Sequence, residues 1–269
     1  MPIRYFINAE LANSLVFGEH PDGLIPATEL YAALIADYPN DPSLRLRYAR
    51  ALMRRGDLES AVPLLKDVPK LVQNDPLTGP KHWLPIAAGT LLGYIHDKWA
   101  DIRKKAGNSD GCIEERITAT NVTMEAVKFW RQLPAEQRNE ETYRVLAYKA
   151  TSNVIFYLSH LVKAGKTEKG LDATALRRTI EEHDSIQVPR FRDHYNTLDN
   201  KMHGYVALGE AEKAKKLARE IYKVLQGHAQ TRAGRALEFH EIGVILDEDE
   251  RENFKTATNV LFSDGREWD

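Results

Sequence analysis

Along most of the chain the apolar residues recur every three or four positions, which is the period of an amphipathic helix. The clearest such stretches run over 82–105, 114–133, 140–164 and 171–184. Alternation of apolar and polar positions, the pattern of a strand, is confined to the short stretch 3–7. We therefore expect an all-α protein.

Glycines stand where turns between these helical stretches are expected. Gly56 and Gly209 each separate two stretches of helical period, and glycine ends a helix at low steric cost because it adopts the left-handed conformation freely. Gly165 predicts a third turn, and the cluster Gly107–Gly111 predicts a fourth. The pattern thus predicts antiparallel helix pairs.

One pattern repeats in the N-terminal part of the chain. Asn40-Asp41-Pro42 recurs 34 residues later as Asn74-Asp75-Pro76. Small or apolar positions follow the same step: Ala27 with Ala61, Tyr31 with Leu65, and Leu34 with Val68. A step of this length corresponds to one helix–turn–helix repeat unit.

The segment from Pro42 to Pro69 resembles the tetratricopeptide repeat family. Gly56-Asp57 stands at its turn, and the small Ala61 lies where the second helix of the family approaches the first. Arg45 and Leu52 replace the tryptophan and tyrosine that the family usually has. The resemblance implies a right-handed superhelix of stacked helix pairs, with a concave face lined by the first helix of each pair.

A second block, from Tyr195 to Leu225, has the same organisation. The five-residue step from Gly209 to Ala214 equals the step from Gly56 to Ala61. A further unit is expected over 236–261. We therefore predict one repeat domain over 1–269, in which the units in register cover about 24–76 and 195–261 and the helices of 77–192 are elongated and degenerate.

Composition narrows the class of protein. The chain has 269 residues, of which 43% are hydrophobic and 28% charged, with a formal net charge of -2. This composition supports a folded core, and there is no apolar run near the roughly 20 residues that cross a bilayer. The N-terminus also lacks a secretory signal pattern. We expect a cytoplasmic protein that binds no membrane and, because its net charge is near zero and its basic residues are interleaved with acids, no DNA. RNA is expected as a partner only under the ribonuclease alternative given below.

Metal and cofactor sites are not indicated. The single Cys112 excludes a zinc cage built from several cysteines. Glu181 to Asp184 are consecutive on a predicted helix and so point in four directions, which prevents them from surrounding one ion. The chain has no glycine-rich phosphate loop. We expect no cofactor.

Three arginines form the first candidate binding site. Arg47, Arg50 and Arg54 follow steps of three and four residues, so they share one helix face. The resemblance places that face on the concave side, where members of the family bind a peptide or a protein partner. Arginines there would hold an acidic segment through bidentate hydrogen bonds. The alternative is a solvated helix face.

The C-terminal block offers a second set of polar residues. Asn196, Asn200 and His203 are similarly spaced, and they would hydrogen-bond the backbone of an extended peptide. Trp268, next to the last residue, would dock on a partner or on a second copy of the chain. Self-association through the C-terminal end is therefore a further hypothesis.

Two alternatives come from other classes of protein. Arg235 and His240 reproduce the R-x4-H element of HEPN-type helical ribonucleases, in which the histidine would move a proton and the arginine would stabilise phosphate charge. The other alternative is an effector-sensing module with an enclosed pocket between Leu77 and Arg192. The favoured hypothesis is a non-catalytic scaffold that binds a protein or peptide.

Overall fold

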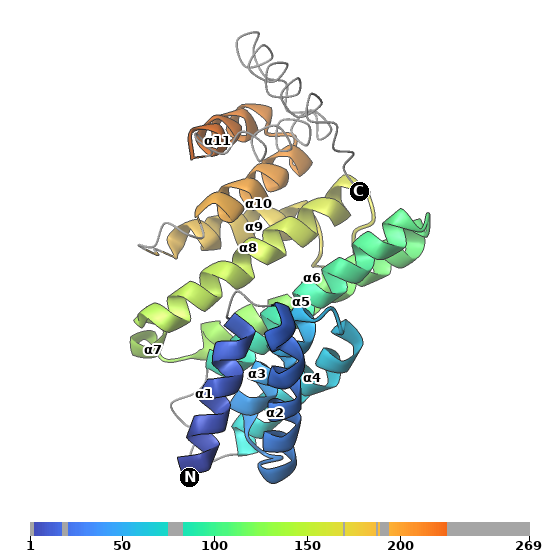
Figure 1. Cartoon of the computed structure of the whole chain (residues 1–269). Helices are drawn as coiled ribbons and strands as arrows, with labels where there is room; N and C mark the ends of the chain where they lie inside the picture. Colours follow the sequence, from blue (N-terminus) through green and yellow to red (C-terminus); the bar gives the residue numbers. More distant parts are fainter. Residues whose placement is uncertain are drawn as a thin grey trace. The chain divides into compact units, whose positions relative to one another are not determined.

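The computed structural model describes residues 3–17, 21–74, 83–168, 170–186, 188 and 194–224. Side chains are described for all of these except 17, 21, 74, 194–196 and 222–224. The described residues form eleven α-helices and no strand (Figure 1). The all-α prediction is confirmed, and the strand-like stretch 3–7 lies in a helix.

The chain divides into two compact units, residues 1–150 and 151–269. Whether the two form one repeat domain, as the sequence predicts, stays a prediction. The helices of the first unit are α1 (Ile3–Phe17), α2 (Leu24–Asp37), α3 (Pro42–Arg54), α4 (Leu58–Asn74), α5 (Trp83–Lys105), α6 (Ser109–Gln132) and α7 (Ala135–Asn139). Helix α8 (Glu141–Lys163) crosses the division, and α9 (Ala173–Ser185), α10 (His194–Ala207) and α11 (Ala211–Val224) belong to the second unit.

Four helices end in the same glycine motif. Gly56, Gly107, Gly165 and Gly209 have φ values between 65° and 85°. In each case the residue after the glycine donates its N–H to a carbonyl five residues back, as Asp57 does to Leu52 at 2.9 Å. This is the Schellman motif, which satisfies carbonyls left open at the end of a helix. The predicted turns are confirmed, but only the first two residues of Gly107–Gly111 lie outside a helix, because α6 already begins at Ser109.

The 34-residue step holds for the second helix of each N-terminal pair. Helix α2 starts at Leu24 and α4 at Leu58. The small and apolar residues that repeat at this step are all buried: Ala27, Tyr31 and Leu34 in α2, and Ala61, Leu65 and Val68 in α4. The first helices do not follow this step, because six residues connect α1 to α2 whereas three connect α3 to α4. The extra length explains why the repeat is visible from residue 27 onward but not earlier.

The α3–α4 pair shows how the departures from the family pattern are accommodated. Arg45, which replaces the usual tryptophan, forms an ion pair of 3.0 Å with Asp67 and so joins α3 to α4. Leu52, which replaces the usual tyrosine, is buried in a core that includes Leu65 and Ile95. Polar and apolar contacts therefore both hold this pair together.

Helices α5 and α6 form a long antiparallel pair within the first unit. A Cβ atom at Gly89 of α5 would lie 2.7 Å from the Cβ of Ala126 in α6. Only glycine therefore permits this close approach of the two helices. In the second unit α10 and α11 pack through an apolar cluster that includes Met202, Ala214 and Ala218. The predicted helix pair of 195–225 is thus confirmed as far as residue 224, and the expected unit 236–261 lies outside the described residues.

Candidate functional site

Two of the three predicted arginines contact helix α1. Arg47 forms an ion pair of 2.9 Å with Glu10, and Arg54 donates a hydrogen bond to the Val16 carbonyl at the end of that helix. The charge of Glu10 raises the pKa of Arg47, against the opposing effect of burial. The two arginines therefore link the first two helix pairs of the protein.

Arg50 differs from its two neighbours. It forms no ion pair or hydrogen bond with any residue that the structure describes, although its side chain is half-buried. Burial, followed by the nearby charge of Arg47, lowers the pKa of Arg50 below its ordinary value. A half-buried cation without a counter-charge is unfavourable, so an anion beside it would be stabilised.

Arg50 lines a cavity of about 190 Å³ between the first helices of successive pairs. The cavity is lined by α1, α2, α3 and the start of α5: Asn13, Val16, Tyr31, Ser43, Leu46, Arg47, Arg50, Trp83 and Leu84. Burial raises the pKa of Tyr31, so its hydroxyl stays neutral. The guanidinium of Arg50, with hydroxyl and amide groups nearby, provides donors for a carboxylate.

The predicted residues of the C-terminal block face the interior of the second unit. The side chain of Asn196 lies outside the described residues. Asn200 donates to the Ser152 hydroxyl at 2.9 Å, and the buried His203 ring lies 5.3 Å from the ring of Phe156. These contacts connect α10 to α8. A role of Asn200 and His203 in peptide binding stays a prediction.

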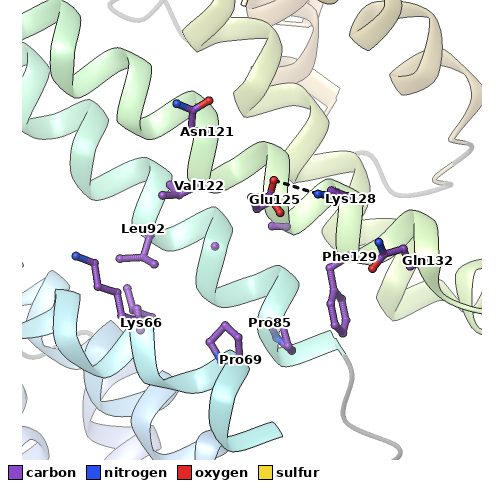
Figure 2. Close-up of a pocket in the computed structure, with 13 residues that line it drawn as sticks. Lys66, Pro69, Pro85, Leu92, Asn121, Val122, Glu125, Lys128, Phe129 and Gln132 are labelled. Atoms are coloured by element: carbon purple, nitrogen blue, oxygen red, sulfur yellow. Dashed lines mark ion pairs between the residues drawn. The ribbon is translucent and has the colours of Figure 1, made fainter. Parts of the chain in front are cut away.

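A larger groove lies between α4, α5 and α6 (Figure 2). Its volume is about 530 Å³ and its walls are mostly apolar, with Leu92 and Phe129 among them. The charged lining side chains are exposed, and two of them, Glu125 and Lys128, form an ion pair of 3.5 Å. The effector-sensing alternative required an enclosed pocket between Leu77 and Arg192. This groove has apolar walls, but part of them comes from α4, which precedes that region. The alternative therefore stays a prediction.

A third groove, of about 670 Å³, was not predicted from the sequence. It lies between the α3–α4 turn and the C-terminal part of α5, with Tyr94 and Ile102 among its lining residues. The signal that would have found it is a run of Tyr94, Lys98, Ile102 and Lys105 on one face of a long helix. Periodicity alone did not show that none of the described helices covers this face.

Other predicted residues fall outside the described part of the chain. Arg235, His240 and Trp268 are among them, so the ribonuclease and self-association hypotheses stay predictions. Among the described residues, no group of three or more His, Cys, Asp or Glu side chains is placed to hold a metal ion. Nor is any described helix long and apolar enough to cross a membrane.

Comparison with known families supports the repeat assignment. Residues 27–77 match the family model described as Tetratricopeptide repeat. This match covers α2 and the α3–α4 pair, the segment in which the 34-residue step was found. No curated protein matches the chain.

The segment 27–77 therefore carries a tetratricopeptide repeat within an all-α protein, and the resemblance stated from the sequence is confirmed. This family is generally non-catalytic, and its fold suggests a protein-interaction scaffold.

Proposed function

We propose that the protein is a non-catalytic cytoplasmic scaffold that binds an acidic segment of a protein or peptide, with one carboxylate on Arg50. The observation that carries the proposal is the half-buried guanidinium of Arg50, which has no counter-charge among the described residues and lies in the cavity between α1, α3 and α5. Arg47 lies in the same cavity but shares its charge with Glu10. Arg50 is thus the principal anchor and Arg47 the secondary one.

The geometry favours a carboxylate over a larger anion. A cavity of about 190 Å³ admits one side chain or a chain terminus rather than a folded surface. Arginine binds a carboxylate through two parallel hydrogen bonds. Arg54 plays a structural part instead, because its guanidinium is bonded to the Val16 carbonyl of α1.

Fluorescence anisotropy with a labelled peptide tests this proposal. The probe is a twelve-residue peptide of Asp, Glu and Gly with a free C-terminal carboxylate. We expect Arg50→Gln to weaken binding by about tenfold or more, because a charge-assisted pair is lost. Arg4→Gln removes the same charge from an exposed position of α1 and serves as the matched control.

Circular dichroism must show that both variants keep the helix content of the wild type. Binding of the probe by the Arg50→Gln variant with unchanged affinity would contradict the proposal, as would an equal loss in the Arg4→Gln variant. A loss of affinity in Arg47→Gln that is smaller than the loss in Arg50→Gln would support Arg50 as the principal anchor and Arg47 as the secondary one.

A further inference from the structure

The C-terminal part of α5 presents an exposed apolar surface. Tyr94 is 43% exposed and Ile102 58% exposed, although both side chains are large and hydrophobic. They lie eight residues apart on the helix and so point to one side. Met53 and Leu58, on either side of the α3–α4 turn, line the same groove of about 670 Å³. We call this groove the α5 shelf.

The length of α5 creates the shelf. Helix α3 has 13 residues whereas α5 has 23, and the α3–α4 turn borders α5 at its C-terminal part. Residues such as Ile102 therefore lack a neighbouring helix of the preceding pair. Contiguous exposed apolar side chains of this kind mark interaction sites in soluble proteins.

The charge of the shelf is positive. Its lining residues include Lys98, Lys104 and Lys105, and none of them forms an ion pair with a described residue. The ammonium of Lys98 lies over the ring of Tyr94, at 5.3 Å from its centroid. Three ammonium groups are thus available to an incoming anion.

The nearby carboxylates do not neutralise these lysines. Asp101, the one acidic side chain among the described residues that line the shelf, lies 2.7 Å from the guanidinium of Arg116, which also binds Asp97. Glu115 of α6 is bound by His96 and by Arg103. The acids of this region are therefore paired with other cations.

We propose that the α5 shelf binds an acidic segment of a partner protein through a bulky apolar side chain flanked by carboxylates. The apolar side chain contacts Ile102, Met53 and Leu58, and the carboxylates pair with the three lysines. Burial of aliphatic groups favours a protein segment over a nucleic acid, whose phosphates would leave Ile102 and Met53 unused.

The shelf is separate from the Arg50 cavity. That cavity includes Trp83 and Leu84 at the start of α5, whereas Ile102 lies near its end. At 1.5 Å per residue, Trp83 and Ile102 are about 28 Å apart along α5. On α3 the two sites are closer, because Met53 of the shelf follows Arg50 of the cavity by three residues. Among the described lining residues none is shared, so Ile102 and the lysines can be changed without altering a residue of the cavity.

A second labelled peptide tests the shelf. The probe is a fourteen-residue peptide of Glu and Asp with two leucines four positions apart. One matched peptide has serine for both leucines, and another has glutamine for all acids. We expect the first to bind the wild type and each matched peptide to bind at least about fivefold more weakly, because both kinds of contact contribute.

Variants of the shelf should separate the two contributions. We expect Lys98→Glu with Lys105→Glu to weaken binding by about tenfold or more, and Ile102→Ser to weaken it by about fivefold. Lys163→Glu with Lys166→Glu makes the same change of charge at exposed positions of the other unit and should leave binding within about twofold of the wild type. Circular dichroism confirms that each variant is folded.

Several results would overturn the proposal. They are unchanged affinity in the Lys98 and Lys105 double variant, no binding of the acidic leucine peptide by the wild type, and loss of binding only in Arg50→Gln. The last result would place the peptide at Arg50 and leave the proposed function standing. Tighter binding of a labelled single-stranded RNA through the same lysines, unaffected by Ile102→Ser, would also overturn it.

Discussion

Two sets of buried hydroxyls, one from each unit, are hydrogen-bonded in different ways, although Thr179 and Ser159 of the second unit also bond carbonyls of their own helix. In the first unit the hydroxyls of Thr120 and Thr123 donate to carbonyls of their own helix, at 2.7 and 2.8 Å. In the second unit the Thr151 hydroxyl lies 2.8 Å from Nδ1 of His183, which joins α8 to α9. Asn200 similarly joins α10 to α8.

Hydrogen bonds within one helix and hydrogen bonds between helices constrain the packing of helices differently. A hydroxyl that is satisfied within its own helix leaves the contact with the neighbouring helix to other groups, as Thr120 and Thr123 of α6 do. Where hydrogen bonds cross between helices, a shift in register would leave buried groups unsatisfied. The second unit thus specifies its packing through polar pairs as well as through its apolar cluster.

Arg116 of the first unit joins two helices through its charge. The side chain is 5% exposed, comes from α6 and binds Asp97 and Asp101 of α5. Asp97 itself is only 8% exposed. The charge network therefore gives the α5–α6 pair a polar contact that its threonines do not.

The largest expected effect is at this network. Arg116→Met should lower the free energy of unfolding by about 3 kcal/mol, because a buried carboxylate loses its counter-charge. Urea denaturation followed by circular dichroism measures the change. Arg103→Met removes an exposed partner of Glu115 and should cost less than about 1 kcal/mol. Equal costs for the two variants would contradict a special role for burial at Arg116.

A smaller effect is expected from two matched threonines. Thr151→Val should cost about 1.5 kcal/mol, because His183, which is 1% exposed, loses the Thr151 hydroxyl in the core. Thr120→Val should cost about 0.5 kcal/mol, because the helix carbonyl it contacts keeps its backbone bond. The same denaturation measurement applies. A Thr120→Val cost equal to or above that of Thr151→Val would remove the distinction between the units.

The glycine turns should respond alike in both units. Gly56→Ala and Gly209→Ala should each cost about 1 kcal/mol, because a Cβ strains the left-handed backbone. No atom lies within 4 Å of the added Cβ at either position, so packing should not add to the cost. Thermal unfolding of both variants checks this. A difference of more than about 1 kcal/mol between them would show that the turns are not equivalent.

The smallest expected effect depends on pH and compares the starts of α4 and α11. The pKa of Asp57 is lowered by its hydrogen bonds with Ser60, and that of Glu210 by its hydrogen bonds with Lys213 and Arg177. A carboxyl with a lowered pKa stabilises the fold above its ordinary pKa, and this contribution is lost as the pH falls through the folded-state value. Stability should therefore decrease between about pH 5 and about pH 3 in the wild type.

Two isosteric variants isolate these contributions. Asp57→Asn still caps a helix, so at neutral pH it should change stability by only a few tenths of a kcal/mol. Its loss between pH 5 and pH 3 should be smaller than that of the wild type, and the same holds for Glu210→Gln. Urea midpoints at the two pH values provide the measurement. Variants with the full pH dependence of the wild type would show that neither carboxyl contributes to it.

The sequence by itself determined the helices, the glycine turns and the 34-residue repeat. These features depend on residues close in the chain: the helical period places apolar residues on one face, and glycine supplies the backbone conformation that ends a helix. The α3–α4 pair was recognisable although Arg45 stands where the family usually has tryptophan, since the small and apolar residues around Gly56 follow the family pattern.

Only the tertiary structure decided what each polar face meets. Steps of three and four residues placed Arg47, Arg50 and Arg54 on one face, but α1 supplies partners for two of them and leaves the third in a cavity. Asn200 faces α8 for the same reason, since spacing does not reveal the neighbouring helix. The α5 shelf depends on the length of α5 relative to α3 and on the position of the α3–α4 turn beside α5. Both are relations between segments that are distant in sequence.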